Sequence, residues 1–269
     1  MKRFVLLVAT IIMVLGMSSI CYATEELSQD SSNNQTEESI ESEDALLIVP
    51  LGTVSKTVSE YDMIKELQGY TTSQLESKGY TATEINSIQQ PLATKETYGK
   101  VTYTITYDQM YQKNGETFLR TKMTWNWSKV PTFLFNDIMA MTTSEAFTKD
   151  SATAKVQYYW GGNKSKKSNL VTEPVKTKNS GAGVYASFPM GKDWDRDNRT
   201  YKEIAMSGYM QTSWSISGKY TQVGISSNYG HSVITGTPSV SFSKAASISF
   251  TPEERCKSGD EAYDKAKLK

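Results

Sequence analysis

The chain has 269 residues, and its 29 basic and 29 acidic residues give a formal net charge of zero at neutral pH. One histidine and two cysteines exclude a disulfide-stapled fold and leave too few ligands for a typical structural zinc site. The sequence has no phosphate-cradling glycine loop, dinucleotide fingerprint or basic stripe interleaved with aromatics, so neither nucleotide nor nucleic-acid binding is expected.

The N-terminus has the order of a secretory signal peptide. Two basic residues precede an uncharged apolar run over 4–15, and small residues lead to Ala23. We therefore expect residues 1–23 to be cleaved, the protein to be secreted, and Cys256 to be the only cysteine of the mature chain. A membrane anchor and a lipid on Cys21 are the alternatives, but the apolar run is shorter than the roughly 20 residues that a spanning helix needs. No later segment is apolar enough to cross a bilayer.

This interpretation predicts that N-terminal sequencing of the exported protein starts at Thr24 and that the mature chain has one free thiol. An intact Met1, or a lipid on Cys21, would contradict it.

An acidic segment follows the signal peptide. Residues 24–44 carry eight acidic residues and no basic one, with almost nothing apolar. Such a segment cannot bury enough surface to offset its ordering entropy. Residues 24–55 are therefore predicted to be a disordered linker or a pro-segment, with a first strand in the apolar stretch at its end. From residue 45 on, 27 basic residues against 21 acidic ones give a net charge of +6, which suits an anionic surface.

Residues 56–92 predict a segment of three short helices. Gly69–Leu75 is echoed ten residues later by Gly79–Ile85. In each copy the glycine is expected to end a helix in the left-handed conformation, and the threonine to cap the next helix in a capping box. Pro91 ends the third helix. The side chains expected to pack together and onto the sheet are Leu67, Tyr70, Leu75, Tyr80, Ile85 and Ile88.

From residue 93 to 256 the pattern changes to an alternation of period two, which is typical of strands. Asn114-Gly115 is a strong hairpin signal between the first two strands. The fold class predicted is mainly β: an antiparallel β-sandwich preceded by a small helical segment. Residues 138–147 fit either a strand or a short helix, and 257–269 are expected to be a flexible tail. The predicted strands are 101–107, 119–127, 154–160, 204–216, 220–226, 232–235, 239–243 and 247–251.

Catalysis is not expected. A serine or cysteine hydrolase would need His231 as its base, but no nucleophile motif accompanies it, and a lone histidine near a turn is more often structural. A glycosidase would need two carboxylates facing a groove, and no pair stands out. The acids considered for such a pair are Asp108, Glu116, Asp137, Glu145 and Glu203.

The most specific local motif holds three carboxylates at alternate positions, Asp193, Asp195 and Asp197. This spacing resembles the start of an EF-hand-type calcium loop, so calcium is the candidate cofactor. Asn198 stands where the loop has glycine, and Glu203 falls one position short of the usual bidentate glutamate. The alternative is a solvated turn whose acids are balanced by neighbouring bases.

The signal peptide, the acidic segment, the Gly-Tyr-Thr repeat, Thr124–Trp127 and Tyr229–His231 together resemble uncharacterised secreted proteins of Gram-positive bacteria. The resemblance implies an extracellular address and brings no known activity. The sequence thus predicts a secreted, non-enzymatic binding or interaction protein associated with the cell envelope, whose partner is a cell-wall polymer or another anionic surface. The alternatives are a pore-forming protein that uses the 204–216 and 220–226 strands as a hairpin, and an envelope-directed hydrolase.

Overall fold

The computed structural model describes residues 53–144, 147–178, 183–233, 239–242, 248–251, 256–258 and 262–267. The predicted signal peptide and the acidic segment up to residue 52 lie outside these ranges. No helix within the ranges is long and apolar enough to span a membrane.

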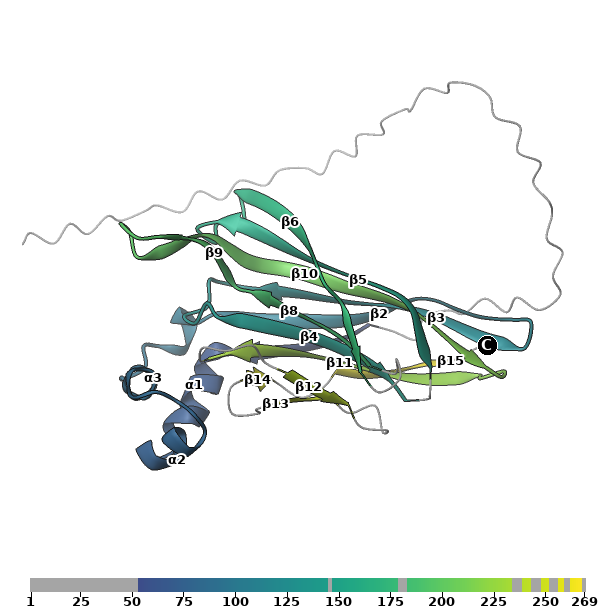
Figure 1. Ribbon diagram of the computed structural model, residues 1–269, viewed down its shortest axis with the longest axis horizontal. Helices are drawn as coiled ribbons and strands as arrows, with labels where there is room; N and C mark the ends of the chain where they lie inside the picture. The colour runs from purple at the N-terminus through teal and green to yellow at the C-terminus, as the bar shows by residue number, and fades with distance from the viewer. Residues whose placement is uncertain are drawn as a thin grey trace, which may run out of the picture. The chain divides into compact units, whose positions relative to one another are not determined.

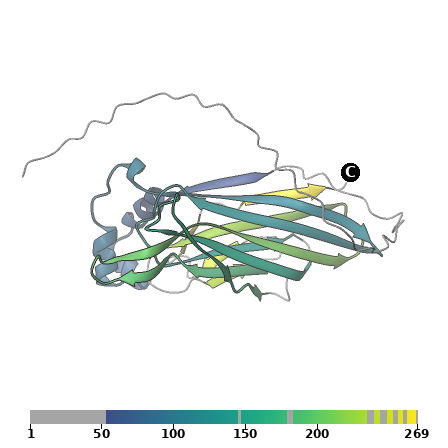
Figure 2. The same cartoon turned by 90° about the horizontal axis from the view of Figure 1, so that it is seen from above.

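Two antiparallel sheets stack on each other (Figure 1), which confirms the predicted mainly-β sandwich. The large sheet has the order β1 (Val54–Ser59), β2 (Lys100–Lys113), β3 (Glu116–Trp127), β10 (Thr200–Ser217), β5 (Thr148–Trp160) and β6 (Lys167–Glu173), and β9 (Gly191–Asp195) pairs with the start of β10. The small sheet has the order β14 (Cys256–Ser258), β11 (Gln222–Ser232), β4 (Asn136–Thr143), β8 (Gly183–Pro189) and β7 (Lys176–Lys178), and β15 (Ala262–Lys267) also pairs with β11. Figure 2 shows the long strands of the large sheet running side by side.

The core lies between the two sheets and is rich in aromatic side chains. Trp125 of the large sheet stacks on Phe188 of the small sheet with ring centroids 5.0 Å apart. Gly208, which pairs with Trp125, has no space for a side chain: a Cβ there would lie 2.8 Å from the indole and 2.6 Å from the Lys155 carbonyl oxygen. The alternation of the sequence therefore buries one face of the long strands of the large sheet, and a glycine makes room for the largest ring.

The helical segment comes before the second strand, as predicted. It contains α1 (Glu60–Gln68), α2 (Thr72–Ser77), α3 (Ala82–Ile88) and the short 3₁₀ helix η1 (Lys95–Thr97). Both predicted capping boxes form, at Thr71 with Gln74 and at Thr81 with Glu84.

Only one of the two glycines of the repeat behaves as predicted. Gly79 is left-handed, with φ 88°, whereas Gly69 is right-handed, with φ −72°, so the prediction for Gly69 is wrong. The amide of Gly69 reaches the Glu66 carbonyl oxygen without a left-handed turn. The predicted cluster of the helical segment forms, with Leu67, Tyr70, Leu75, Tyr80, Ile85 and Ile88. It also includes Phe133 and Val233, which follow the strands β3 and β11.

The strands on either side of Gly218 do not form the hairpin that the pore-forming alternative uses. Gly218 makes a turn with φ 111°, but β10 pairs within the large sheet and β11 within the small sheet. The reason is burial: β11 is buried at every position after its first, so it needs partners on both faces. The other face of the small sheet is covered by a further hairpin, β12 (Ser239–Phe242) with β13 (Ile248–Thr251).

Several strands were not foreseen. Residues 138–147 were predicted to form either a strand or a short helix, and most of them lie in the strand β4. β6, β7 and β9 have few alternating apolar residues, whereas β8 does alternate, at Val184, Ala186 and Phe188, and was overlooked. β14 and β15 form largely where a flexible tail was predicted. β14 and β15 pair through the backbone with β11, and backbone pairing leaves little trace in a polar sequence.

Candidate functional site

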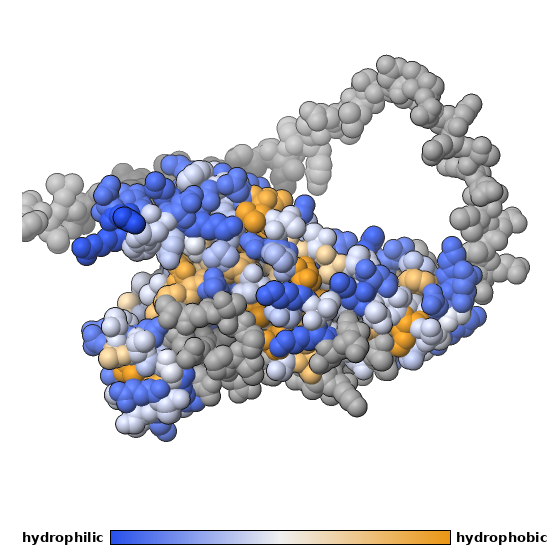
Figure 3. Space-filling model, in the orientation of Figure 1, coloured by the Kyte–Doolittle hydropathy of each residue, from blue (hydrophilic) through white to orange (hydrophobic). Residues whose placement is uncertain are grey.

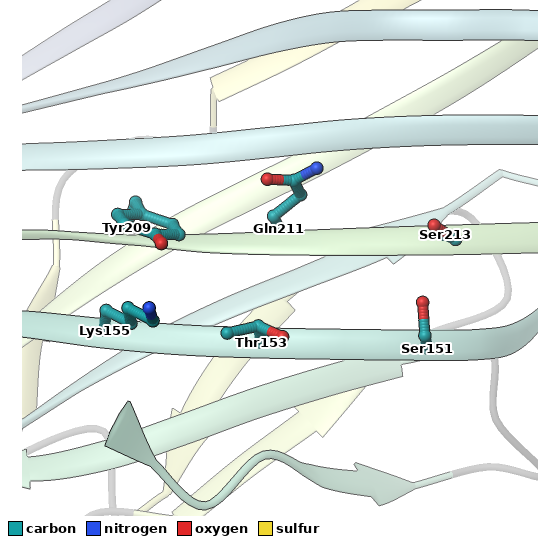
Figure 4. A pocket seen from close by; sticks show the side chains of 6 residues that line it. All are labelled: Ser151, Thr153, Lys155, Tyr209, Gln211 and Ser213. Carbon is teal, nitrogen blue, oxygen red and sulfur yellow. The ribbon is translucent and has the colours of Figure 1, made fainter. Parts of the chain in front are cut away.

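The outer face of the large sheet holds the candidate site, a shallow polar hollow over β5 and β10. It has a volume of about 230 Å³. Its walls come in three pairs that lie directly opposite each other on the two strands, Lys155 with Tyr209, Thr153 with Gln211, and Ser151 with Ser213. Figure 4 shows these six side chains along the two neighbouring strands.

The residue pairs that line the hollow have further neighbours on the adjacent strand, β3. Thr124 lies opposite Tyr209, and Lys122 lies opposite Gln211. The Lys122 ammonium sits 4.7 Å from the centroid of the Tyr209 ring, a cation–π contact that holds the ring between two strands.

Two cations frame Tyr209. Lys155 is on β5 opposite Tyr209 and Lys122 is on β3 opposite Gln211, so the two lysines lie diagonally on either side of β10, with their Cα atoms roughly 12 Å apart. Neither ammonium has a carboxylate partner among the described residues. The next cation along β3, Arg120, is by contrast 3.7 Å from Asp108. The centre of the outer face therefore carries uncompensated positive charge.

Hydroxyl groups extend the polar surface toward the β1 edge. Ser55 and Thr104 share a hydrogen bond of 2.8 Å, and Thr57 and Thr102 share one of 2.9 Å. A ligand on this face would meet hydroxyl, amide and ammonium groups on an open surface. The hollow is smaller and more polar than a typical small-molecule pocket, so it fits one segment of a longer molecule better than an enclosed small ligand.

The lone histidine lies elsewhere, in a buried charge cluster between the helical segment and the sandwich. The His231 side chain has no exposed surface. Its Nδ1 is 3.0 Å from both carboxylate oxygens of Asp137, on β4. Its Nε2 is 3.5 Å from Oε1 of Glu60, the first residue of α1. That contact is electrostatic rather than a well-formed hydrogen bond.

Each carboxylate of the cluster is anchored by other donors. Glu60 accepts hydrogen bonds from the Thr132 amide and hydroxyl and from the Phe133 amide. Asp137 accepts from the Tyr229 hydroxyl at 2.6 Å and from the Ser232 amide at 3.0 Å. The cluster thus connects α1, β4, β11 and the loop after β3.

The imidazole is held in its charged form. Burial alone lowers the pKa of His231. The Asp137 and Glu60 carboxylates beside it raise the pKa by more than burial lowers it, so the resulting pKa is about 10. Because the ring is buried and both nitrogens face carboxylates, His231 is placed as a structural cation, in line with the structural role favoured from the sequence. Two of the acids considered for a glycosidase pair are thus buried. Asp137 belongs to the charge cluster, and Glu203 accepts hydrogen bonds from Ser168 and Asn169.

The three aspartates of the calcium motif lie on the hairpin between β9 and β10. Asp195 Oδ1 accepts hydrogen bonds from the amides of Asp197 and Asn198, and its Oδ2 accepts one from the Asn198 side chain. These hydrogen bonds lower the pKa of Asp195, and the one from the Asn198 side chain has the largest effect. Asp193 is left-handed, with φ 55°. Within the described ranges, no group of three or more His, Cys, Asp or Glu side chains is arranged to hold a metal ion. Calcium at this turn stays a hypothesis.

The calcium hypothesis predicts that millimolar calcium raises the melting temperature relative to chelator, because a ligand of the folded state stabilises it by mass action. The Asp195→Asn variant should lose that rise. Equal melting temperatures for both proteins with calcium and with chelator would contradict the hypothesis.

No protein-family model matches the chain, and no curated protein matches it in sequence. Three solved structures illustrate its distant structural similarity. The Clostridium perfringens delta-toxin is 8% identical, with 64% of this chain and 85% of the toxin covered and a TM-score of 0.27. The C-terminal domain of the Streptococcus agalactiae AgI/II polypeptide BspA is 7% identical, with 82% and 81% covered and a TM-score of 0.31. The C-terminal domain of the Streptococcus pyogenes antigen I/II-family protein AspA is 8% identical, with 82% of each chain covered and a TM-score of 0.30. At these TM-scores the similarity carries no argument about function, which must come from the residues.

Sequence reasoning missed the outer face as a site. Lys122, Lys155 and Tyr209 lie on three strands that are far apart in the chain, so their proximity follows only from the strand order. One signal was present: each lies at a position that alternates with buried residues of its strand, which places its side chain on the face away from the core.

Proposed function

We propose that this is a secreted, cell-envelope-associated binding protein whose outer sheet face holds an anionic, hydroxyl-rich polymer such as a cell-wall polymer. The observation that carries the proposal is the pair of uncompensated lysines, Lys122 and Lys155, on either side of Tyr209.

The chemistry of the face matches such a ligand. Ammonium groups bind phosphate or carboxylate oxygens, while Gln211, Thr153 and Ser151 offer donors and acceptors to hydroxyl groups. The face is open along the rows of the sheet, so a long chain is able to continue beyond the hollow in either direction. A linear polymer uses this geometry better than a small molecule, because it gains from many weak contacts at once.

A panel of immobilised polymers tests the proposal. The mature protein is passed over poly(glycerol phosphate) teichoic acid, over peptidoglycan stripped of teichoic acid, and over a neutral glucan. We expect retention on the teichoic acid alone, with binding that weakens as salt is added because the lysines are partly exposed. Retention on none of the three, or equal retention on all of them, would contradict the proposal.

A further inference from the structure

Three of the exposed large apolar side chains of the described residues lie at one end of the large sheet, away from the hollow. Four large apolar side chains are exposed, namely Val130, Trp160, Leu170 and Trp194. Trp194 is opposite Tyr201 in the β9–β10 pair, and Trp160 is opposite Glu203 in the β5–β10 pair. Both tryptophans, 52% and 47% exposed, therefore flank the first residues of β10.

The third apolar residue at this end, Val130, lies against the turn that follows Trp160. A Cβ at Gly162, two residues after Trp160, would lie 2.1 Å from a Val130 methyl, so Val130 covers this glycine. Leu170 is separate, on the edge strand β6 opposite Gln157.

Positive charge surrounds the two tryptophans. The turn after Trp160 and the β9–β10 hairpin together span residues 160–167 and 191–203, which contain seven basic and four acidic residues. One of the acids, Glu203, is buried, and Lys192 is 3.8 Å from Glu173. The six basic residues left are exposed: Lys164, Lys166, Lys167, Arg196, Arg199 and Lys202. Figure 3 shows this end of the molecule, around β9, as mainly hydrophilic.

Both turns are held firmly. The amide of Gly161 donates to the Lys202 carbonyl oxygen at 2.7 Å, which ties the turn after β5 to β10. The Asp195 carboxylate accepts three hydrogen bonds within the other turn. The Trp194 ring packs edge-on against Tyr201 with centroids 4.9 Å apart. The turns that carry the tryptophans are thus ordered before binding, which lowers the ordering cost on binding.

We propose that this end, the residues 160–167 and 191–203 with Val130, docks the protein on an anionic lipid bilayer. Tryptophan prefers the boundary between headgroups and acyl chains, because its ring is apolar and its N–H is polar. Surrounding lysines and arginines are attracted to anionic headgroups, and the two contributions add in peripheral membrane binding. The excess of positive charge over these two turns favours a negatively charged surface over a neutral glycan.

The test is co-sedimentation of the mature protein with vesicles, read together with tryptophan fluorescence. Vesicles of phosphatidylcholine alone are compared with vesicles that also contain phosphatidylglycerol. We expect binding to the anionic vesicles, with a blue shift of the emission. Replacing both tryptophans, in Trp160→Ala/Trp194→Ala, should weaken binding by about tenfold or more.

Two control variants separate this surface from other effects. Leu170→Ala removes an equally exposed apolar side chain elsewhere and should bind as the native protein does. Lys122→Met/Lys155→Met alters the polymer-binding face and should also keep its vesicle binding, so the failure of one proposal does not imply failure of the other. The proposal is overturned if the native protein ignores anionic vesicles, binds neutral ones equally, or binds just as well without the two tryptophans. Binding to a glycan but to neither vesicle would also overturn it.

Discussion

The variant His231→Ala is expected to lose about 3–5 kcal/mol of unfolding free energy, because it leaves two buried carboxylates without the cation between them. Asp137 and Glu60 are both fully buried in the native protein. Each would keep its amide and hydroxyl donors but would face the other carboxylate across an empty space. The measurement is urea denaturation of the native and variant proteins, followed by circular dichroism.

A matched control comes from an ion pair in the same part of the chain. Lys95 and Asp62 are 2.8 Å apart with about half of each side chain exposed, so Lys95→Ala should cost between zero and about 1 kcal/mol. If His231→Ala does not fold, Glu60→Gln keeps the Asp137–His231 pair and should show an intermediate loss of about 1–3 kcal/mol. A loss from His231→Ala no larger than that of Lys95→Ala would contradict the structural role of the cluster.

The same cluster predicts that the protein loses stability as the pH rises from neutral. In the unfolded chain His231 has its ordinary pKa of 6.5, and in the folded protein its pKa is raised to about 10. Between these values the folded state binds a proton that the unfolded state has released. The contribution of His231 is therefore complete below pH 6.5 and falls as the pH rises toward 10, by up to about 1.4 kcal/mol per pH unit.

Urea denaturation between about pH 6 and pH 9.5 measures this slope. The range ends below the ordinary pKa of tyrosine because burial raises the pKa of Tyr158, and its titration would add a loss of the same sign. The variant His231→Gln should show a much flatter profile over the same range. A flat profile in the native protein, or an equal slope in the variant, would show that His231 is not held as a cation.

Local features of this fold were predictable because they depend on neighbouring residues. The capping boxes at Thr71 and Thr81 need only side chains three positions apart, and the Asn114-Gly115 turn needs only two left-handed residues. Gly69 shows the limit, since the same Gly-Tyr-Thr motif ends its helix with a different backbone conformation.

Strand pairing was not predictable in the same way. The strands 204–216 and 220–226 were predicted, but whether the turn at Gly218 between them makes a hairpin or a crossing between sheets depends on what covers β11. The charge cluster had the same difficulty: Glu60, Asp137 and His231 are widely spaced in the chain, and only the fold places the start of α1 and strand β4 next to His231 of β11. Residues of the outer face likewise become a site only through the order of β3, β10 and β5.

The outer face of the large sheet is proposed to bind an anionic polymer through Lys122 and Lys155. The most direct measurement is the affinity of the double variant Lys122→Met/Lys155→Met for poly(glycerol phosphate) teichoic acid, at a fixed salt concentration. Lys65→Met is the control, since it removes an exposed lysine from α1, outside the sheet. We expect the double variant to bind about tenfold more weakly or worse, and Lys65→Met to bind as the native protein does. Native affinity in the double variant, or an equal loss in the control, would contradict it.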